Sequence, residues 1–383
     1  MKWKIAVVGG GINGAGIAWE LARRGYEVDL FEKGEFGAAT SSATTKMIHG
    51  GLRYLEQLQF GLVRESLRDR KFLLQNLPRL VHPLELYIPI FHDSRRPMWM
   101  IQTGLILYDL LAGRDRLENH RRLSADQILE AAPIRRARLI GGFRYLDAQV
   151  DDRELVRTVV ASAVRDGLRA HEKSEVTGVE RLESSWHLST SGETDGDGTF
   201  DLLVNAAGPW MNGFLERNAL PSHFRLSLIR GSHIVLRRRV SEKGFLLESP
   251  GEKRVFFVLP WKGRTLVGTT EELHRGPIDG VRATEVEIHY LLDRFNEYFA
   301  PMAKEDEIVE SFAGVRPLTG RQDDPNDISR EYRIETAPRL VNVFGGKMTT
   351  FLSLANSVGE EVDRLLGERR RAAPPVFAGS DGR

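Results

Sequence analysis

The sequence predicts an α/β protein in which a Rossmann-like domain, built on a parallel sheet, is interleaved with a second domain built on an antiparallel sheet. An apolar strand at the N-terminus runs into a glycine-rich turn, a helix and a second strand, which is typical of the first domain. Strands near the middle of the chain alternate between apolar and polar residues, which is typical of the second. Because 383 residues exceed what one hydrophobic core usually serves, two joined domains are expected.

The opening segment carries the spacing of a nucleotide-binding turn. Ile5–Val8 is an apolar run typical of a buried parallel strand, and Gly9, Gly11 and Gly14 follow it as G-x-G-x-x-G. Glycines allow a tight turn and let the backbone approach a pyrophosphate, whose charge the N-terminus of the next helix stabilises. The strand, glycines and helix in register favour a dinucleotide site over a turn with only a structural role.

A second strand, Glu27–Phe31, ends at Glu32. An acidic residue at this place, roughly 20 residues beyond the glycines, accepts hydrogen bonds from ribose hydroxyls. It favours an adenosine ribose that carries no 2′-phosphate.

Two later strand ends favour FAD over NAD. The segment Leu202–Trp210 is an apolar strand that ends in small residues, as a close approach to a cofactor requires. The segment Val341–Val362 passes from a strand through Gly345 and Gly346 into a helix, which offers a further helix N-terminus to a polar cofactor group. Three such strand ends in one chain indicate a flavin cradle.

The antiparallel domain is expected from the strands HIVLRRRV, RVFFVLPW and RTLVGTT, and a helix is expected over Ala283–Phe299. We predict an FAD-binding domain from residues 1–80, 140–215 and 310–367. The substrate domain then takes residues 81–139 and 216–309, and residues 368–383 form a polar tail that we expect to be disordered or weakly packed.

Composition and charge exclude several functions. The net charge is +1, from 54 basic and 53 acidic residues, which argues against nucleic acid as a partner because its binding needs a large basic excess. The absence of cysteine excludes disulfides, thiolate catalysis, cysteine-ligated zinc and iron–sulfur clusters, and it fits a reducing compartment. No metal site is expected, and a homo-oligomer is compatible with the sequence.

The N-terminus shows no secretory signal, so we expect a cytoplasmic protein or one on the cytoplasmic face of a membrane. The longest apolar stretch, Pro97–Gly113, is too short and too often interrupted to span a bilayer. It predicts a helix with arginines at both ends, which either packs inside the substrate domain, the interpretation we favour slightly, or lies in a membrane interface.

Seven motifs resemble the FAD-dependent glycerol-3-phosphate dehydrogenases: GGGINGAGIA, ATSSATTKMIHGGLRYLE, VNAAGPW, IRGSHIV, VGTTE, GVRPL and FGGKMTT. The resemblance runs from Lys4 to about Leu366, and the long motif around His49 is specific to that family. The wider superfamily, which includes D-amino-acid and sarcosine oxidases, shares the fold without this motif. Family members usually continue into a C-terminal helical domain, so the chain resembles a short form.

The resemblance implies oxidation of sn-glycerol 3-phosphate to dihydroxyacetone phosphate, with hydride transfer to FAD and electrons passed to a quinone or another acceptor. It also implies peripheral attachment to a membrane. Two other functions stay open: a flavin oxidase or dehydrogenase of a small amino or 2-hydroxy acid, since the same arginines could hold a carboxylate, and a non-catalytic FAD-binding subunit.

The catalytic candidates are His233, Arg316 and Lys347. A phosphorylated polyol needs cations for its phosphate and a group that receives the hydroxyl proton as hydride leaves. We expect Arg316 at the carbinol oxygen and Lys347 at either the developing oxyanion or the cofactor. A histidine titrates in the right range to accept the proton, so His233 acts either as the base or as an orienting group.

The substrate-binding candidates are Arg53, Tyr54, Thr270 and Arg330, with Arg330 expected at the phosphate because arginine binds phosphate in a bidentate manner. Tyr54 either closes over the substrate or belongs to the core. In the family the loop TSSATTK lies along the cofactor. The cofactor-binding candidates are Gly9, Gly11, Gly14, Glu32, Thr40, Ser41, Ser42, Lys46, His49, Gly50, Ala207, Gly208, Gly346, Lys347, Met348 and Thr349.

Overall fold

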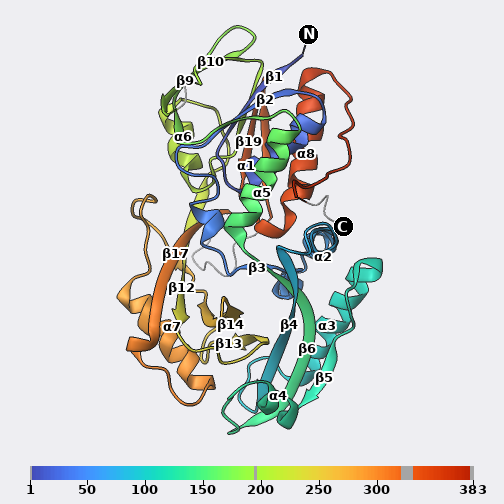
Figure 1. The fold of residues 1–383 in the computed structure, drawn as a ribbon, viewed down its shortest axis with the longest axis vertical. Coiled ribbons are helices and arrows are strands. Elements are labelled where there is room, and N and C mark those ends of the chain that lie inside the picture. Colours follow the sequence, from blue (N-terminus) through green and yellow to red (C-terminus); the bar gives the residue numbers. More distant parts are fainter. Residues whose placement is uncertain (1, 194–195, 321–330, 380–383) are drawn as a thin grey trace.

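The structure, a computed structural model, describes residues 2–193, 196–320 and 331–379. Two sheets follow one another along the long axis of the molecule, and the chain passes between them several times (Figure 1). This arrangement confirms the predicted α/β class, with a Rossmann-like part and an antiparallel part.

The first sheet has six strands in the order β18-β19-β11-β1-β2-β7. All neighbours are parallel except β18, which pairs antiparallel to β19 at the edge. The strands are β1 (Lys4–Val8), β2 (Glu27–Phe31), β7 (Arg169–His171), β11 (Leu202–Asn205), β18 (Arg333–Ala337) and β19 (Leu340–Phe344). The carboxyl ends of the five parallel strands lie at one edge, which is where ligands bind in open sheets of this kind.

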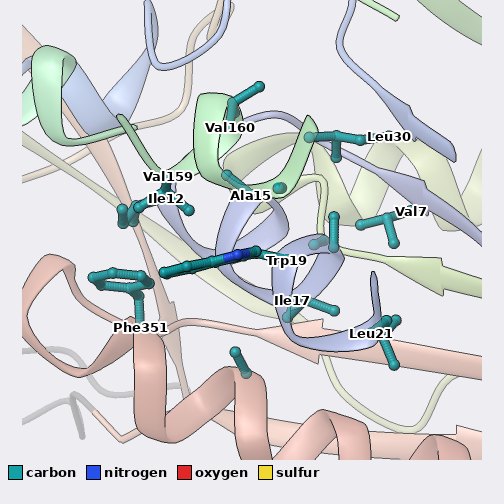
Figure 2. Close-up of a cluster of buried hydrophobic side chains, with 14 of the residues drawn as sticks. Val7, Ile12, Ala15, Ile17, Trp19, Leu21, Leu30, Val159, Val160 and Phe351 are labelled. Carbon is teal, nitrogen blue, oxygen red and sulfur yellow. The ribbon is translucent and has the colours of Figure 1, made fainter. Parts of the chain in front are cut away.

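Three helices form one hydrophobic cluster with this sheet: α1 (Ile12–Arg23), α5 (Asp152–Arg165) and α8 (Phe351–Leu366). Trp19 lies inside the cluster, fully buried, in the neighbourhood of Ile12, Val159 and Phe351 (Figure 2). A second cluster joins the sheet to β8 (Ser174–Arg181), β9 (Trp186–Gly192), β10 (Gly198–Phe200) and α6 (Met211–Arg217). Burial between these layers explains why β1 and β11 are mostly apolar.

The second sheet has ten strands and is antiparallel except where β13 pairs with β4. Eight of its strands are hydrogen-bonded in the order β16-β12-β15-β14-β13-β4-β6-β3. In addition, β17 pairs with β12 and β5 pairs with β6. The strands are β3 (Met47–Ile48), β4 (Val81–Phe91), β5 (Arg121–Ser124), β6 (Leu139–Val150), β12 (Leu226–Leu236), β13 (Gly244–Glu248), β14 (Val255–Trp261), β15 (Arg264–Gly268), β16 (Glu272–Leu273) and β17 (Ile308–Thr319).

The remaining helices are mostly attached to the second sheet (Figure 1). They are α2 (Phe60–Asn76), α3 (Met98–Ala112), α4 (Ala125–Ala131) and α7 (Glu285–Tyr298). Short 3-10 turns are η1 (Thr40–Ser42), η2 (Leu52–Gln57), η3 (Gly113–Asp115), η4 (Gly208–Trp210), η5 (Glu305–Glu307) and η6 (Met348–Thr350). In the described part of the chain, no helix combines the length and the apolar character that crossing a membrane requires.

The predicted domain boundaries at residues 140 and 310 each fall inside a strand. Residues 140–150 belong to β6, which pairs along its length with β4, and residues 310–319 belong to β17, which pairs with β12. Backbone pairing therefore places both segments in the second sheet, whereas the sequence had suggested the first domain.

Residues 368–379 of the predicted tail form no helix or strand, but the segment is held in place near its end. Phe377 is 1% exposed, and its ring lies 4.9 Å from that of Trp19. The backbone N–H of Ala378 donates to Ser162 Oγ at 2.8 Å, and that of Arg370 donates to Asp363 at 3.0 Å. One aromatic anchor and these hydrogen bonds hold a segment that is otherwise polar.

Candidate active site

A cavity of about 550 Å³ extends from the strand ends of the first sheet to a cluster of arginines at the second sheet. It is lined by segments that are far apart in the sequence: the end of β1, the segments that follow β2, β11 and β19, and part of β17. The predicted site residues that line it are Gly9, Gly11, Gly14, Glu32, Thr40, Ser41, His49, Arg53, Tyr54, Ala207, Gly208, Arg316, Gly346, Lys347, Met348 and Thr349.

The glycine-rich turn forms one wall of this cavity. A Cβ atom at Gly9, where φ is +108°, would lie 2.4 Å from the carbonyl oxygen of Ala206. A Cβ atom at Gly14 would lie 1.8 Å from the carbonyl oxygen of Gly9. Only glycine fits at both positions, and the turn delivers the N-terminus of α1, capped at Gly11, to the cavity.

Gly346, in the segment after β19, lies against the same turn: its φ is +92°, and a Cβ atom there would lie 2.4 Å from Asn13 Nδ2. Asn13 donates through Nδ2 to the carbonyl oxygen of Gly345 at 2.9 Å. Its Oδ1 is buried and has no hydrogen-bond partner among the described residues. We call Gly9, Gly14 and Gly346 the glycine cradle. A buried amide oxygen beside it fits a cofactor that brings its own donor groups.

The carboxylate of Glu32 is held at the tip of β2 by the backbone. Oε2 accepts from the Gly10 N–H at 2.7 Å, and Oε1 accepts from the Gly34 N–H at 2.8 Å. The two bonds fix the carboxylate at the cavity wall, at the place where a ribose is expected.

The hydroxyl-rich loop divides into residues that face the cavity and residues that do not. Ser41 Oγ accepts from the Ile12 N–H at 3.0 Å, and Thr40 Oγ1 donates to the Val315 carbonyl at 2.9 Å. Ser42 and Lys46 do not line the cavity, although both were expected at the cofactor. Lys46 Nζ lies 2.8 Å from Asp152 Oδ1 and 2.5 Å from the Ser42 carbonyl, because the buried ammonium needs these partners. These two residues position the loop instead.

The segment His49–Tyr54 passes between the two sheets. The His49 N–H donates to Thr349 Oγ1 at 3.2 Å, and His49 lines the cavity. Gly50 does not line it: its N–H donates to the Tyr108 hydroxyl at 3.0 Å and to Asp147 at 3.2 Å, and its missing side chain leaves room for Tyr108. Gly50 thus faces the buried side of this segment.

The second-sheet end of the cavity is cationic. Arg316 donates to Glu271 Oε1 at 3.0 Å and to Thr269 Oγ1 at 2.7 Å. Arg53 Nη1 lies 3.5 Å from Glu271 Oε2. Lys347 Nζ lies 4.5 Å from the ring centre of Tyr54, a cation–π distance. An anion with a hydroxyl nearby is the ligand that such a set fits.

Two predicted residues lie behind the cavity wall. Thr270 is buried, accepts from the Ser232 N–H at 2.9 Å and donates to Glu287 at 2.8 Å. His233 is 1% exposed and does not line the cavity. Predicted Arg330 lies outside the described residues.

The ring of His233 stacks on Phe312 with centroids 4.9 Å apart, and Nε2 lies 3.1 Å from Thr45 Oγ1. Burial lowers the pKa of His233 well below its ordinary value, and Arg316 and Lys46 add to this effect. A neutral ring in this place suits the orienting role better than that of a base, because protonation would bury a further positive charge.

The sequence interpretation missed several residues that line the cavity. Glu271 is the last residue of the motif VGTTE, of which only Thr270 was predicted to bind the substrate. Ser174, Glu175 and Val176 line the end near Glu32 without any recognisable motif. Thr45 lines the cavity, and its hydroxyl lies 3.1 Å from Nε2 of His233. A hydroxyl in the loop TSSATTK was the available signal for Thr45.

Comparison with known proteins agrees with this geometry. Residues 4–361 match the family described as FAD dependent oxidoreductase. The chain is 39% identical over 368 residues to a glycerol-3-phosphate dehydrogenase of Pseudomonas aeruginosa, which covers 93% of this chain and 70% of the relative. It is 38% identical over 361 residues to a D-erythritol 1-phosphate dehydrogenase of Brucella abortus, which covers 91% of this chain and 71% of the relative.

Among solved structures, the glycerol-3-phosphate dehydrogenase of Bacillus halodurans, complexed with FAD, superimposes with a TM-score of 0.80 at 25% identity. The match covers 100% of this chain and 68% of that one. The glycine cradle, the fixed Glu32 carboxylate and the orphaned Asn13 oxygen fit FAD as the cofactor. The chain therefore belongs to the FAD-dependent oxidoreductase family, among the glycerol-3-phosphate dehydrogenases.

Proposed function

We propose that this protein oxidises the secondary hydroxyl of a small polyol phosphate, with sn-glycerol 3-phosphate as the preferred substrate and dihydroxyacetone phosphate as the product. The observation that carries the proposal is the cluster of Arg53, Arg316 and Lys347 at the end of a cavity that begins at the glycine cradle. The names of the relatives support the same substrate class, since both act on polyol phosphates.

In the proposed reaction, the C–H bond of the carbinol carbon breaks with its electron pair, the hydroxyl proton leaves and a carbonyl forms. FAD, when bound, accepts the hydride. Arg316 donates to the carbinol oxygen and keeps its orientation through Glu271 and Thr269. Arg53 and Lys347 attract the phosphate. Lys347 also stabilises the negative charge that develops on the carbinol oxygen. Arg330 stays the predicted phosphate ligand.

The proton needs an acceptor that reaches the substrate. His49 lines the cavity, whereas Thr45 lies between the cavity and His233. We therefore propose His49 as the base and His233 as the orienting group, linked to the site through the Thr45 hydroxyl. Of the two roles that the sequence left open for His233, the orienting role fits better, because His233 does not line the cavity and burial lowers its pKa.

The test is an anaerobic substrate panel on the purified, FAD-loaded protein. The substrates are sn-glycerol 3-phosphate, D-erythritol 1-phosphate, glycerol, and representative amino and 2-hydroxy acids. Rapid bleaching of the flavin band by sn-glycerol 3-phosphate, with little effect of glycerol, is the expected result. Reduction by an amino or 2-hydroxy acid alone would replace this function with the carboxylate alternative. Reduction by dithionite but by no substrate would favour the non-catalytic subunit.

The electron acceptor is proposed to be a quinone, reached from the surface of a membrane. Helix α3 exposes apolar side chains on the side away from its packed residues: Trp99 is 68% exposed and Leu110 is 69% exposed. Arg95 and Arg114 lie near the two ends of the helix. Such a helix can rest in an interface while its other side packs on the second sheet.

Flotation with anionic liposomes tests this attachment. Replacing Trp99 and Leu110 by serine should release the protein from vesicles that retain the wild type. The matched control is Val286→Ser, which removes an exposed apolar side chain from α7. Wild-type protein that stays at the bottom of the gradient would remove the membrane proposal and leave the dehydrogenase proposal unaffected.

A further inference from the structure

The carboxylate of Glu271 occupies an unusual position for an acidic group in an anion site. Its side chain is 4% exposed and lines the cavity directly after the turn that ends β15. Each of its oxygens faces a different arginine: Oε1 is 3.0 Å from Arg316 Nη1, and Oε2 is 3.5 Å from Arg53 Nη1. One carboxylate therefore links η2 with β17 across the cavity.

The backbone around Glu271 is itself fixed. Arg254 Nη2 donates to the Glu271 carbonyl at 2.9 Å, and the neighbouring Thr269 hydroxyl accepts from Arg316 at 2.7 Å. The Arg316 guanidinium lies over Gly231, where a Cβ atom would come within 2.4 Å of Nη2. Glu271 and Thr269 thus both hold the fork of Arg316, and of these two Glu271 carries charge.

This end of the cavity carries a negative side chain, Glu271, among its positive ones. The described side chains that carry positive charge there are Arg53, Arg316 and Lys347. Asp147 also lines the cavity, but Arg70 neutralises it at 2.6 Å. Among these described side chains, Glu271 cancels one of the three positive charges and so lowers the attraction of this end of the cavity for an anion.

We propose that Glu271 is a positioning residue that sets the spacing and the net charge of the Arg53–Arg316 pair. The polyol phosphate then binds in one orientation, with its carbinol oxygen at Arg316. This role rests on the proposed function and names the residue that fixes the substrate within that site. The negative charge of Glu271 weakens the binding of an anion. Its contact with Arg316, however, holds that side chain where turnover requires it. The two effects have opposite signs and can be separated.

Two variants separate them. Glu271→Gln removes the charge and places an amide donor against one arginine, whereas Glu271→Asp keeps the charge and shortens the reach. In the FAD-loaded protein, the affinity for inorganic phosphate is measured from the perturbation of the flavin spectrum. The limiting rate of flavin reduction by sn-glycerol 3-phosphate is measured by anaerobic stopped flow. Glu272→Gln is the matched control, because Glu272 is the next residue, is exposed and does not line the cavity.

We expect Glu271→Gln to bind phosphate about threefold to tenfold more tightly, because the site gains net positive charge. We expect its limiting reduction rate to fall about 10- to 100-fold, because a displaced Arg316 misaligns the carbinol. Glu271→Asp should keep phosphate affinity within about twofold and still be slow. A residue with only a structural role would instead lower affinity, rate and FAD content together.

Weaker phosphate binding by Glu271→Gln, wild-type reduction rates in both variants, or no phosphate binding by the wild type would each overturn the proposal. If sn-glycerol 3-phosphate does not reduce the wild type, the proposed function fails. The phosphate measurements still decide whether Glu271 sets the charge of the site, so the two failures are distinguishable.

Discussion

The guanidinium of Arg70 lies 2.6 Å from Asp147 Oδ1 at the contact between α2 and β6, where both side chains are 2% exposed. Asp147 also accepts from the Tyr108 hydroxyl at 2.8 Å and from the Gly50 N–H. This ion pair therefore supports the segment that carries His49 and Arg53 into the cavity, although neither partner was singled out in the sequence.

Arg70→Met should reduce the free energy of unfolding by about 3 to 5 kcal/mol, because it leaves a buried carboxylate without its counter-charge. Urea unfolding of the FAD-loaded protein gives the value. Arg136→Met is the control, since Arg136 and its partner Asp126 are largely exposed and should contribute less than about 1 kcal/mol. Equal effects at the two positions would show that the buried pair has no special role.

Arg316→Ala should retain FAD and lose about 100-fold or more in the rate of substrate-driven flavin reduction, since one donor to a developing oxyanion is worth that much. The flavin spectrum reports cofactor content, and stopped-flow absorbance reports the rate. Arg136→Ala, far from the cavity lining, serves as the control. Normal turnover in Arg316→Ala would refute the role given to this residue.

The two histidines should differ in their effect on the pH dependence of reduction. His49→Asn is expected to slow reduction about 100-fold or more and to remove the limb of the pH–rate profile that belongs to the base. His233→Asn is expected to slow it less than about tenfold and to keep that limb, because His233 acts through Thr45. The reverse pattern would return the role of base to His233.

Burial of His233 also predicts a dependence of stability on pH. Its pKa is lowered in the folded protein, so the unfolded chain binds the proton more readily. The contribution to stability is complete above the unfolded pKa of about 6.5 and falls with decreasing pH, by up to about 1.4 kcal/mol per unit. Unfolding of the wild type and of His233→Gln between pH 5 and 8 should show a shallower slope in the variant. Parallel slopes would contradict this account.

Phe377 should anchor the C-terminal segment. Phe377→Ala removes a buried ring from its contact with Trp19 and is expected to cost about 3 kcal/mol, as for other core phenylalanines. Thermal unfolding measures the loss, and limited proteolysis should cut the tail earlier in the variant. Val376→Ala, at a residue that is 47% exposed, should leave both measurements close to wild type. Rapid cleavage of the wild-type tail would argue against the anchor.

Local chemistry explains what the sequence predicted well. The strand, Gly9, Gly14 and the following helix lie within one short segment, and steric limits at each glycine dictate the turn. Glu32 follows from the same unit because the length of one βαβ connection fixes its position. Predictions of this kind need no knowledge of distant contacts.

Contacts between distant segments explain what was missed. The full extent of β6 and β17 depends on pairing with β4 and β12, which no local pattern reveals. Glu271 becomes part of the site only because β17 and η2 bring their arginines to it. The position of His233 in the motif IRGSHIV likewise did not reveal that its side chain lies behind the cavity wall. Side chains along one strand point alternately to the two faces of a sheet, and the motif does not say which face lines the cavity.

The order of strands in the first sheet also affects how the protein is made. Strands β1 and β2 leave the ribosome early, but β1 must pair with β11 near residue 204, and β11 must pair with β19 near residue 342. Strand β1 can pair with β2 at once, but its other neighbour, β11, is made much later, and β11 lacks its second neighbour until β19 has been translated. Long-range parallel pairing of this kind folds slowly and exposes apolar edges meanwhile. Nascent chains halted before residue 340 should depend on chaperones, or on early FAD binding at the completed glycine turn, to stay in solution.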